Sequence, residues 1–308
     1  MQKYLPLWLG ILLILMVPAN QASEPQIVVT IKPIHALVSG VMAEVGTPDL
    51  LLPGGESPHN YSLPLSQVRQ LHAATLVIWV GPTVETFLDK TLTTLSHKTQ
   101  ILRLIEVPNL TLLKIRDGKA WETHHHHESH DNDFEIDPHI WLSPNNAKIL
   151  VHTIAQTLQK IDTNNATRYR TNAAHLVKRL EQLDHSLNQQ LVPIKKLPYL
   201  VFHDAYQYFE HHYGLTAMGA VSLSTDIPIS VKRLHQLRAR LKNPQIRCIF
   251  SEPQFESPLV ATLIENTSVR RGTLDPLGAA LPAGTESYFT LLRNLAFSLK
   301  QCLQTVHQ

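Results

Sequence analysis

The chain has 308 residues, which favours two domains over one because a single domain usually spans about 100 to 200 residues. Hydrophobic residues make up 44% of it and charged residues 17%, a composition that excludes a disordered chain. Lys and Arg (27) nearly balance Asp and Glu (25), and no basic run occurs, which argues against nucleic acid or an anionic membrane as partner. The unusual count is histidine, with 18 residues beside only two cysteines. A zinc finger or iron–sulfur protein would need more thiols, so the composition favours a globular protein that handles a metal through imidazole.

Residues 1–22 are predicted to be a secretory signal peptide. Lys3 precedes an apolar run from Leu5 to Pro18, and small and polar residues follow as far as Ala22. The run is shorter than the roughly 20 residues that span a bilayer, so a retained transmembrane helix is disfavoured. We expect cleavage near Ala22. No cysteine lies there to carry a lipid, so the mature protein is expected to have no membrane anchor.

The N-terminal lobe is predicted to cover residues 23–143. Short β-branched runs alternate here with amphipathic stretches, which is a β-α-β pattern and predicts a parallel sheet. A helix capped by Ser62 is expected before the last strand. The predicted strands are 27–31, 49–52 and 76–80, and the predicted helices are 34–45 and 64–73.

Residues 144–194 are predicted to form a helical connection. Two stretches, 144–161 and 165–191, have a clear helical period, and no glycine occurs between Asp137 and Tyr213. The second stretch is predicted to be a long bridging helix that restrains the motion of the lobes, as a Gly/Ser linker would not. One of its faces carries Leu176, Leu180, Leu183 and Leu187.

The C-terminal lobe is predicted to cover residues 195–308 and repeats the alternation. The fold class is therefore α/β, with two lobes that each hold a mostly parallel sheet flanked by helices, and with the ligand cleft between them. The predicted strands are 199–202, 217–223, 247–250 and 271–274, and the predicted helices are 206–213, 231–241, 259–267 and 288–303.

Both cysteines lie in this lobe, Cys248 in an apolar stretch and Cys302 near the end of the last predicted helix. In an exported protein such a pair is expected to form a disulfide. Two buried free thiols are the alternative.

Residues 122–133 follow neither pattern. Five histidines mix there with four carboxylates, so the segment cannot bury apolar area and is predicted to be a loop. We expect it to bind metal weakly, with a simple polar loop as the alternative. The histidines are His124, His125, His126, His127 and His130.

Four further residues are candidate metal ligands. His203 and Asp275 each follow a predicted strand and precede a helix, and His59 lies in a turn after another strand. Ligands of open parallel sheets bind beyond the carboxyl ends of the strands, so these side chains are placed to meet one. With His139, which follows Asp137-Pro138, they provide three imidazoles and one carboxylate. This set suits tetrahedral Zn²⁺ better than Mn²⁺, which prefers more oxygen ligands.

Six motifs, spread in order over the whole mature chain, resemble those of the periplasmic zinc-binding proteins of bacterial ABC importers, the ZnuA-like branch of the metal-binding substrate-binding proteins. The motifs are 59–62 (HNYS), 79–82 (WVGP), 137–144 (DPHIWLSP), 202–206 (FHDAY), 251–255 (SEPQF) and 272–278 (GTLDPLG).

The resemblance implies that the protein captures zinc in the periplasm and delivers it to an inner-membrane ABC permease with a cytoplasmic ATPase. It implies His59, His139 and His203 as zinc ligands, with Asp275 at or near the metal. It also implies two lobes joined by one long helix, a Cys248–Cys302 disulfide and a monomer. One departure is Pro58, which stands where some relatives carry an acidic residue.

Two other functions remain open from the sequence. An exported zinc-dependent hydrolase could use three histidines and an open position to activate water. No His-Glu-x-x-His motif occurs, however, so we expect the protein not to be an enzyme. A zinc buffer or adhesin without a transporter is the other alternative. We further expect Asp204 or Glu252 to orient the imidazoles of the site.

Overall fold

The structure is a computed structural model that describes residues 25–116, 121, 136–222, 229–255 and 258–304. The predicted signal peptide, residues 1–22, and the histidine-rich segment, residues 122–133, lie outside the described residues.

The first sheet has four parallel strands in the order β2-β1-β3-β4. The central pair is aligned so that Val28 lies beside Val77, and the next pair so that Val77 lies beside Ile101. Every residue of β1 and β3 is buried, which agrees with their continuous apolar runs. The elements of this part are β1 (Ile27–Val29), α1 (Lys32–Val41), β2 (Asp49–Leu50), α2 (Leu65–Ala73), β3 (Leu76–Trp79), α3 (Asp89–Leu92) and β4 (Gln100–Arg103).

The second sheet also has four parallel strands, in the order β6-β5-β7-β8. Tyr199 of β5 pairs with Cys248 of β7, which in turn pairs with Arg270 of β8. The elements of this part are β5 (Tyr199–Val201), α6 (Gln207–Tyr213), β6 (Ala217–Ala220), α7 (Val231–Leu241), β7 (Cys248–Ser251), α8 (Pro258–Ile264) and β8 (Arg270–Thr273).

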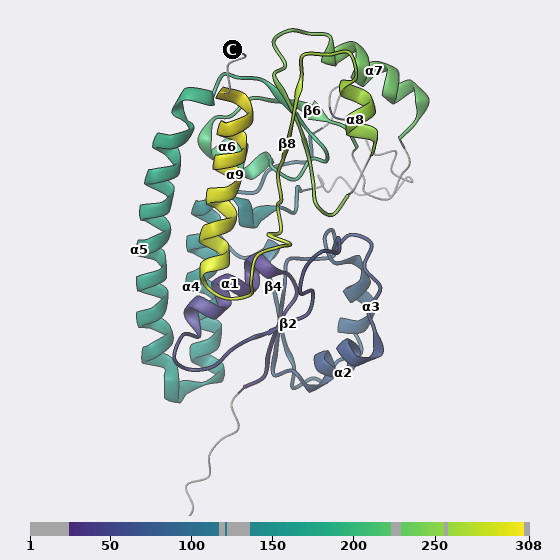
Figure 1. Ribbon diagram of the computed structural model, residues 1–308. Coiled ribbons are helices and arrows are strands. Elements are labelled where there is room, and N and C mark those ends of the chain that lie inside the picture. The colour runs from purple at the N-terminus through teal and green to yellow at the C-terminus, as the bar shows by residue number, and fades with distance from the viewer. Residues whose placement is uncertain (1–24, 117–120, 122–135, 223–228, 256–257, 305–308) are drawn as a thin grey trace, which may run out of the picture.

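A layer of helices lies along one side of both sheets (Figure 1). It consists of α1 together with α4 (Pro144–Ile161), α5 (Ala166–Leu191) and α9 (Glu286–Gln304). At 1.5 Å per residue, α5 is about 39 Å long, and Figure 1 shows it running beside both sheets. Its predicted leucine face is confirmed, because the four leucines are all buried. Single turns of 3₁₀ helix occur at Thr86–Leu88, Leu104–Glu106, Ile140–Leu142, Thr163–Asn165 and Val192–Ile194.

One hydrophobic core continues through this layer from the first sheet to the second. It includes Val29 of β1, Leu158 of α4, Leu180 of α5, Phe250 of β7 and Leu295 of α9. Two smaller cores lie elsewhere, one involving α2 and β3 and the other involving α7 and β7. The two sheets are therefore joined by side-chain packing in the helical layer as well as by the chain that connects them. Within the described ranges, no helix is both long enough and apolar enough to cross a bilayer.

The predicted two-lobed α/β architecture is confirmed, with differences in detail. The short helix α3 was not predicted. Strand β4 was not predicted, because Gln100–Arg103 is an edge strand with two exposed residues and lacks the apolar run of a buried strand. The predicted cap Ser62 is wrong: α2 begins at Leu65, and its N-cap position is Pro64, which makes no side-chain capping hydrogen bond.

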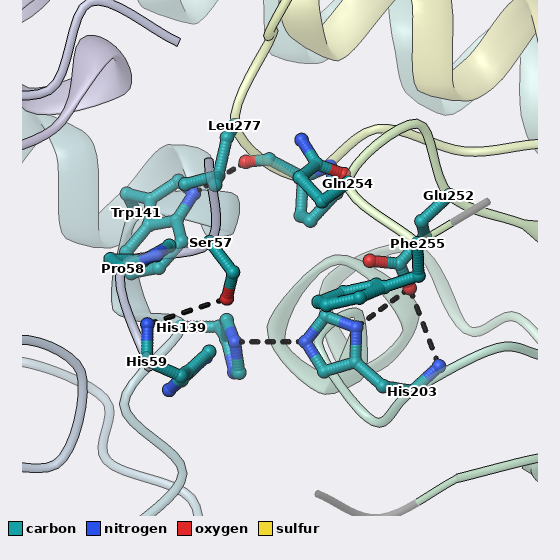
Figure 2. Close-up of a pocket in the computed structure, with 11 residues that line it drawn as sticks. Ser57, Pro58, His59, His139, Trp141, His203, Glu252, Gln254, Phe255 and Leu277 are labelled. Carbon is teal, nitrogen blue, oxygen red and sulfur yellow. Dashed lines mark hydrogen bonds and ion pairs between the residues drawn. The ribbon is translucent and has the colours of Figure 1, made fainter. Parts of the chain in front are cut away.

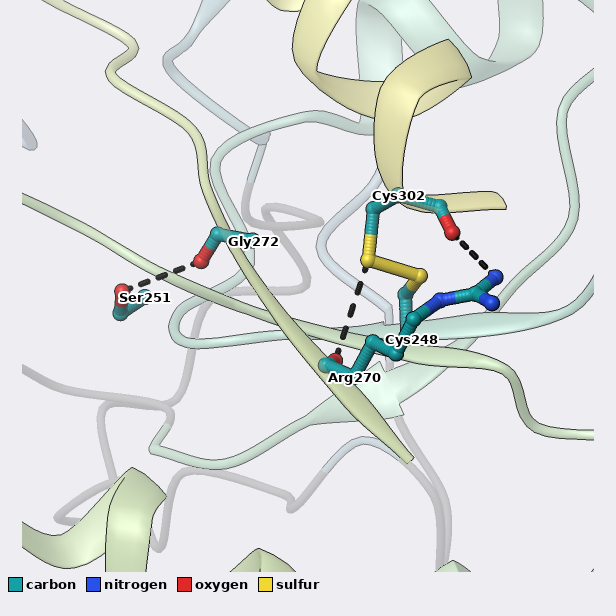
Figure 3. The surroundings of a disulfide bond; sticks show 5 residues. All are labelled: Cys248, Ser251, Arg270, Gly272 and Cys302. Carbon is teal, nitrogen blue, oxygen red and sulfur yellow. Dashed lines mark hydrogen bonds between the residues drawn. A yellow bond between two sulfur atoms is a disulfide. The ribbon is translucent and has the colours of Figure 1, made fainter. Parts of the chain in front are cut away.

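The predicted disulfide is present and the free-thiol alternative is wrong (Figure 3). Cys248 of β7 bonds to Cys302 of α9, with their Cα atoms 6.2 Å apart and a sequence separation of 54. The neighbouring Arg270 guanidinium donates a hydrogen bond to the carbonyl oxygen of Cys302. The last helix is therefore fixed covalently to the second sheet.

Candidate metal centre

His203 follows β5 and is held by a carboxylate from the neighbouring strand. Glu252, directly after β7, accepts hydrogen bonds at Oε1 from the His203 ring Nδ1 (2.7 Å) and backbone N–H (3.3 Å). Both residues are buried. Because Nδ1 donates to the carboxylate, the lone pair of the neutral ring lies on Nε2.

His139 is held in the same way from within its own segment. The Asp137 carboxylate accepts from the His139 backbone N–H (2.9 Å) and from its ring Nδ1 (2.8 Å) at one oxygen, Oδ1. The Asp137 carbonyl in turn accepts a hydrogen bond from the Tyr208 hydroxyl (2.7 Å), which ties this turn to α6. His139 also presents Nε2, and its ring orientation is fixed before any ligand arrives.

His59 lies in a turn after β2 and is less enclosed than the other two histidines. Its backbone N–H donates to the Ser57 hydroxyl (3.3 Å) and its carbonyl accepts from Thr86 (3.4 Å). The turn needs Gly54, whose φ is +124°. A Cβ there would come within 2.6 Å of the Lys32 ammonium and 2.7 Å of the Ala279 carbonyl oxygen.

The three imidazoles converge (Figure 2), with one nitrogen from each lying within 4.8 Å of the others. Among the residues that the structure describes, this is the only group of three or more potential ligand side chains so close together. The Nε2 atoms of His139 and His203 are 3.4 Å apart. In a tetrahedral complex with Zn–N bonds of about 2.0 to 2.1 Å, two ligand nitrogens are roughly 3.3 Å apart. The spacing of this pair matches one edge of such a tetrahedron.

The pocket around the histidines is mainly apolar. Pro58, Trp141, Phe255 and Leu277 line it together with the three imidazoles (Figure 2). The Trp141 indole N–H donates to the carbonyl oxygen of Pro276 (2.8 Å), another residue that lines the pocket, so the polar atom of the indole is not free. These side chains limit the access of water to the imidazoles.

The electrostatics favour an uncharged His139. Burial, with the neighbouring His203 as a smaller cause, lowers the pKa of His139 to about 3. Burial also acts to lower the pKa of His203, but the carboxylates around it, Glu252 first and then Asp204 and Asp137, outweigh burial and the pKa is raised. Burial raises the pKa of Asp137 to about 7. Of these two imidazoles, His203 is therefore the one at which protons compete more strongly with a metal.

Asp275, the fourth predicted ligand, is not part of this group. It follows β8, where its carboxylate bonds the turn: Oδ1 accepts from the N–H groups of Leu277 (3.0 Å) and Gly278 (2.9 Å), and Oδ2 from that of Ala279 (2.6 Å). The Gln254 side-chain amide also donates to Oδ1 (2.8 Å). The five histidines of the histidine-rich segment lie outside the described residues.

Two residues near the site were missed by the sequence analysis. Asp137 orients His139, and its signal was present as an acidic residue two positions before a candidate ligand. Arg116 forms an ion pair with Asp204, and it lies in none of the sequence motifs that indicated the site. Of the two carboxylates expected to orient imidazoles, Glu252 does so, whereas Asp204 pairs with Arg116 instead.

The family model described as "ZnuA: Zinc-uptake complex component A periplasmic" matches residues 27–302. The chain belongs to the ZnuA family. It is 40% identical to the High-affinity zinc uptake system protein ZnuA of Brucella abortus, over 90% of this chain and 91% of that one. It is 36% identical to the protein of that name from Yersinia pestis, over 95% of each chain. A crystal structure of ZnuA has the same fold, with a TM-score of 0.77 and 24% identity over 91% of this chain and 99% of the other.

Proposed function

We propose that this protein captures Zn²⁺ in the periplasm and delivers it to an inner-membrane ABC permease that works with a cytoplasmic ATPase. The observation that carries the proposal is the 3.4 Å spacing of the His139 and His203 Nε2 atoms, each set by a carboxylate on the far side of its ring. Membership of a family of periplasmic zinc-uptake components supports the cargo and the compartment. Zinc is the transported substrate here and not a resident cofactor.

In this proposal His59, His139 and His203 are the zinc ligands. The tight grouping of their nitrogens supports a three-imidazole site. Asp275 is the fourth ligand that the sequence predicts, but its carboxylate would first have to leave the N–H groups of its own turn. A small exchangeable ligand such as water needs no such rearrangement. Asp275→Asn tests this point: unchanged zinc affinity supports water, and a large loss supports the carboxylate.

We propose a binding protein in preference to an exported zinc-dependent hydrolase. A hydrolase would need a general base that reaches a metal-bound water on the Nε2 side of the imidazoles. The two carboxylates beside the histidines, Asp137 and Glu252, instead accept hydrogen bonds from Nδ1, on the opposite edge of each ring. The apolar wall of the pocket also restricts water. Release of product from ester or peptide substrates by the zinc-loaded protein would contradict this choice. A zinc buffer or adhesin would bind zinc but would not support uptake through a permease.

The proposed domain division is an N-terminal lobe of residues 23–143, a helical connection of residues 144–194 and a C-terminal lobe of residues 195–308, in a monomer. The cleft between lobes is the expected place of binding, since His59 and His139 come from the first lobe and His203 from the second. The continuous core through the helical layer supports only modest closure on binding.

The histidine-rich segment, residues 122–133, is proposed to be an accessory, low-affinity zinc collector that raises the local zinc concentration near the cleft. Its deletion should leave the cleft affinity unchanged and reduce uptake under zinc limitation. Unchanged uptake in a strain that carries the deletion would contradict this role.

The decisive experiment is a calorimetric titration with Zn²⁺ of the mature protein and of His59→Ala, His139→Ala and His203→Ala. One tight site is expected in the parent protein, weakened strongly in each variant. His152→Ala is the matched control, since His152 is an exposed histidine on α4. Retention of the tight site in all three variants would refute the assignment.

A further inference from the structure

Four carboxylates surround the three histidines, and each is already engaged. Asp137 and Glu252 bond the Nδ1 edges of His139 and His203, the edges opposite the converging Nε2 atoms. Asp275 bonds the backbone of its turn. Asp204, the residue directly after His203, is paired with Arg116. The other three carboxylates also accept hydrogen bonds from backbone N–H groups. The hydrogen bonds to Asp204 come from the Arg116 side chain, so a substitution of Arg116 can release this carboxylate.

The Arg116 guanidinium engages both oxygens of Asp204. Its Nε donates to Oδ2 (2.9 Å) and its Nη2 donates to Oδ1. The third nitrogen, Nη1, donates to Oε2 of the buried Glu210 (2.7 Å). A bidentate pair of this kind fixes the plane of the carboxylate as well as its position. Only 15% of the Asp204 side chain is exposed, so water does not compete freely for it.

Arg116 is itself held firmly, although it precedes residues that the structure leaves undescribed. Its guanidinium carbon lies 3.5 Å from the centre of the Trp121 ring. The backbone before it is bonded to α6: the Leu113 N–H donates to the Tyr208 hydroxyl (3.1 Å), and the Lys114 carbonyl accepts from the Gln207 amide (3.1 Å). Lys114 also forms an antiparallel bridge with Ile136, three residues before His139.

Asp204 lies beside the site because it directly follows His203. The two residues are joined by a trans peptide bond, so their Cα atoms are about 3.8 Å apart. Released from Arg116, the carboxylate would be an oxygen donor on the residue next to a ligand, which is the donor type that Mn²⁺ favours and that a three-imidazole zinc site lacks.

We propose that Arg116 determines the metal selectivity of the site by keeping the Asp204 carboxylate out of the coordination of the metal. Arg116 touches no ligand atom of the metal, so it is a positioning residue. The inference rests on the proposed zinc-binding function and deepens it. It predicts that selectivity can be changed without altering any of the three histidines.

The test is to measure the affinities for Zn²⁺ and Mn²⁺ by competition titration in the parent protein and in Arg116→Met. Methionine keeps an unbranched apolar stem, although it is shorter than arginine, and removes both the charge and the donors. The ratio of Mn²⁺ affinity to Zn²⁺ affinity should rise at least about tenfold, which corresponds to ~1.4 kcal/mol. The visible spectrum of the Co²⁺-loaded variant should weaken, as expected for more than four ligands. Arg116→Lys, which retains a cation, should show a smaller rise.

Two further variants make the result specific. In Arg116→Met/Asp204→Asn the ratio should return to the parental value, because the released donor is gone. Asp204→Asn alone should leave the ratio unchanged, because this carboxylate does not ligate in the parent protein. A parental ratio in Arg116→Met, a raised ratio in the double variant, or a changed ratio in Asp204→Asn would each overturn the proposal.

Stability is controlled by circular dichroism and thermal unfolding, since Arg116→Met leaves two carboxylates without their cation. If that variant does not fold, Arg116→Met/Glu210→Gln removes one of the two charges and keeps Asp204, and the same rise is expected. A parent protein that binds no Zn²⁺ would refute the proposed function. Normal zinc binding with unaltered selectivity in the Arg116 variants would refute only the role of Arg116.

Discussion

The three histidines of the candidate site are held in two different ways. His139 and His203 are buried, and their rings are oriented by carboxylates at 2.8 and 2.7 Å, respectively. His59, by contrast, lies in a glycine-containing turn and is only partly buried. Two of the proposed ligands are thus preorganised and the third is carried by a turn. Zinc affinity should depend most on the preorganised pair.

The largest expected effect comes from removing a preorganised ligand. His203→Ala deletes one nitrogen and leaves Glu252 buried without its partner. If the roughly 10–16 kcal/mol of a protein zinc site is shared by four ligands, one ligand contributes about 3 kcal/mol, so zinc affinity should fall at least about a hundredfold. Calorimetry measures the loss. His59→Ala should also lower zinc affinity but leave the thermal stability of the metal-free protein unchanged. Equal destabilisation by both variants would remove the contrast between the buried histidines and His59.

The next effect tests orientation without removing a ligand. Glu252→Gln keeps the shape of the side chain but lets it present an amide to the His203 ring in place of a carboxylate. Loss of such a partner typically lowers metal affinity by about 10- to 100-fold. Asp137→Asn should act similarly on His139, and Glu106→Gln, an exposed glutamate, is the control. If both cleft variants bind zinc as the parent protein does, the carboxylates do not orient the ligands.

A smaller effect should come from the turn that carries His59. Gly54→Ala places a Cβ against Lys32 and Ala279 at a φ of +124°, which costs of order 1–3 kcal/mol of strain. We expect lower thermal stability and a loss of zinc affinity below about tenfold, since only one ligand is displaced. Gly55→Ala is the matched control, because its φ is also positive (+91°) but no atom lies within 4 Å of its added Cβ. Equal effects of the two substitutions would show that strain alone, and not the contact with Lys32 and Ala279, is responsible.

The smallest effect is a shift in pH dependence. The pKa of His203 is raised, because the carboxylates around it, Glu252 first, outweigh the opposing effect of burial, so protons compete with zinc at His203 from above the ordinary histidine value of about 6.5. Zinc affinity should therefore fall as pH drops through that range. In Glu252→Gln the fall should begin at a lower pH, because the neutral amide no longer stabilises the imidazolium. Zinc affinity measured between pH 5 and 8 gives the shift. If affinity began to fall at a lower pH in the parent protein than in Glu252→Gln, the predicted direction of the shift would be wrong.

Much of the fold could be predicted from sequence because the buried strands are continuous apolar runs and α4 and α5 keep a strict helical period. The exposed edge strand β4 lacks that pattern and was missed. The three histidines could be proposed from strand ends and family motifs. The engagement of Asp275 by its own turn and the pairing of Arg116 with Asp204 could not, since such contacts depend on side-chain geometry between residues as far as 88 positions apart.

The continuous core in the helical layer has a consequence for unfolding. Val29 of the first sheet and Phe250 of the second belong to one apolar cluster, joined through α4, α5 and α9. If either sheet unfolded or separated from the helices, the apolar residues of that cluster would be exposed to water. Heating the metal-free protein should therefore give a single calorimetric transition whose van't Hoff enthalpy equals the calorimetric one, as for a single cooperative domain, although the chain contains two separate sheets.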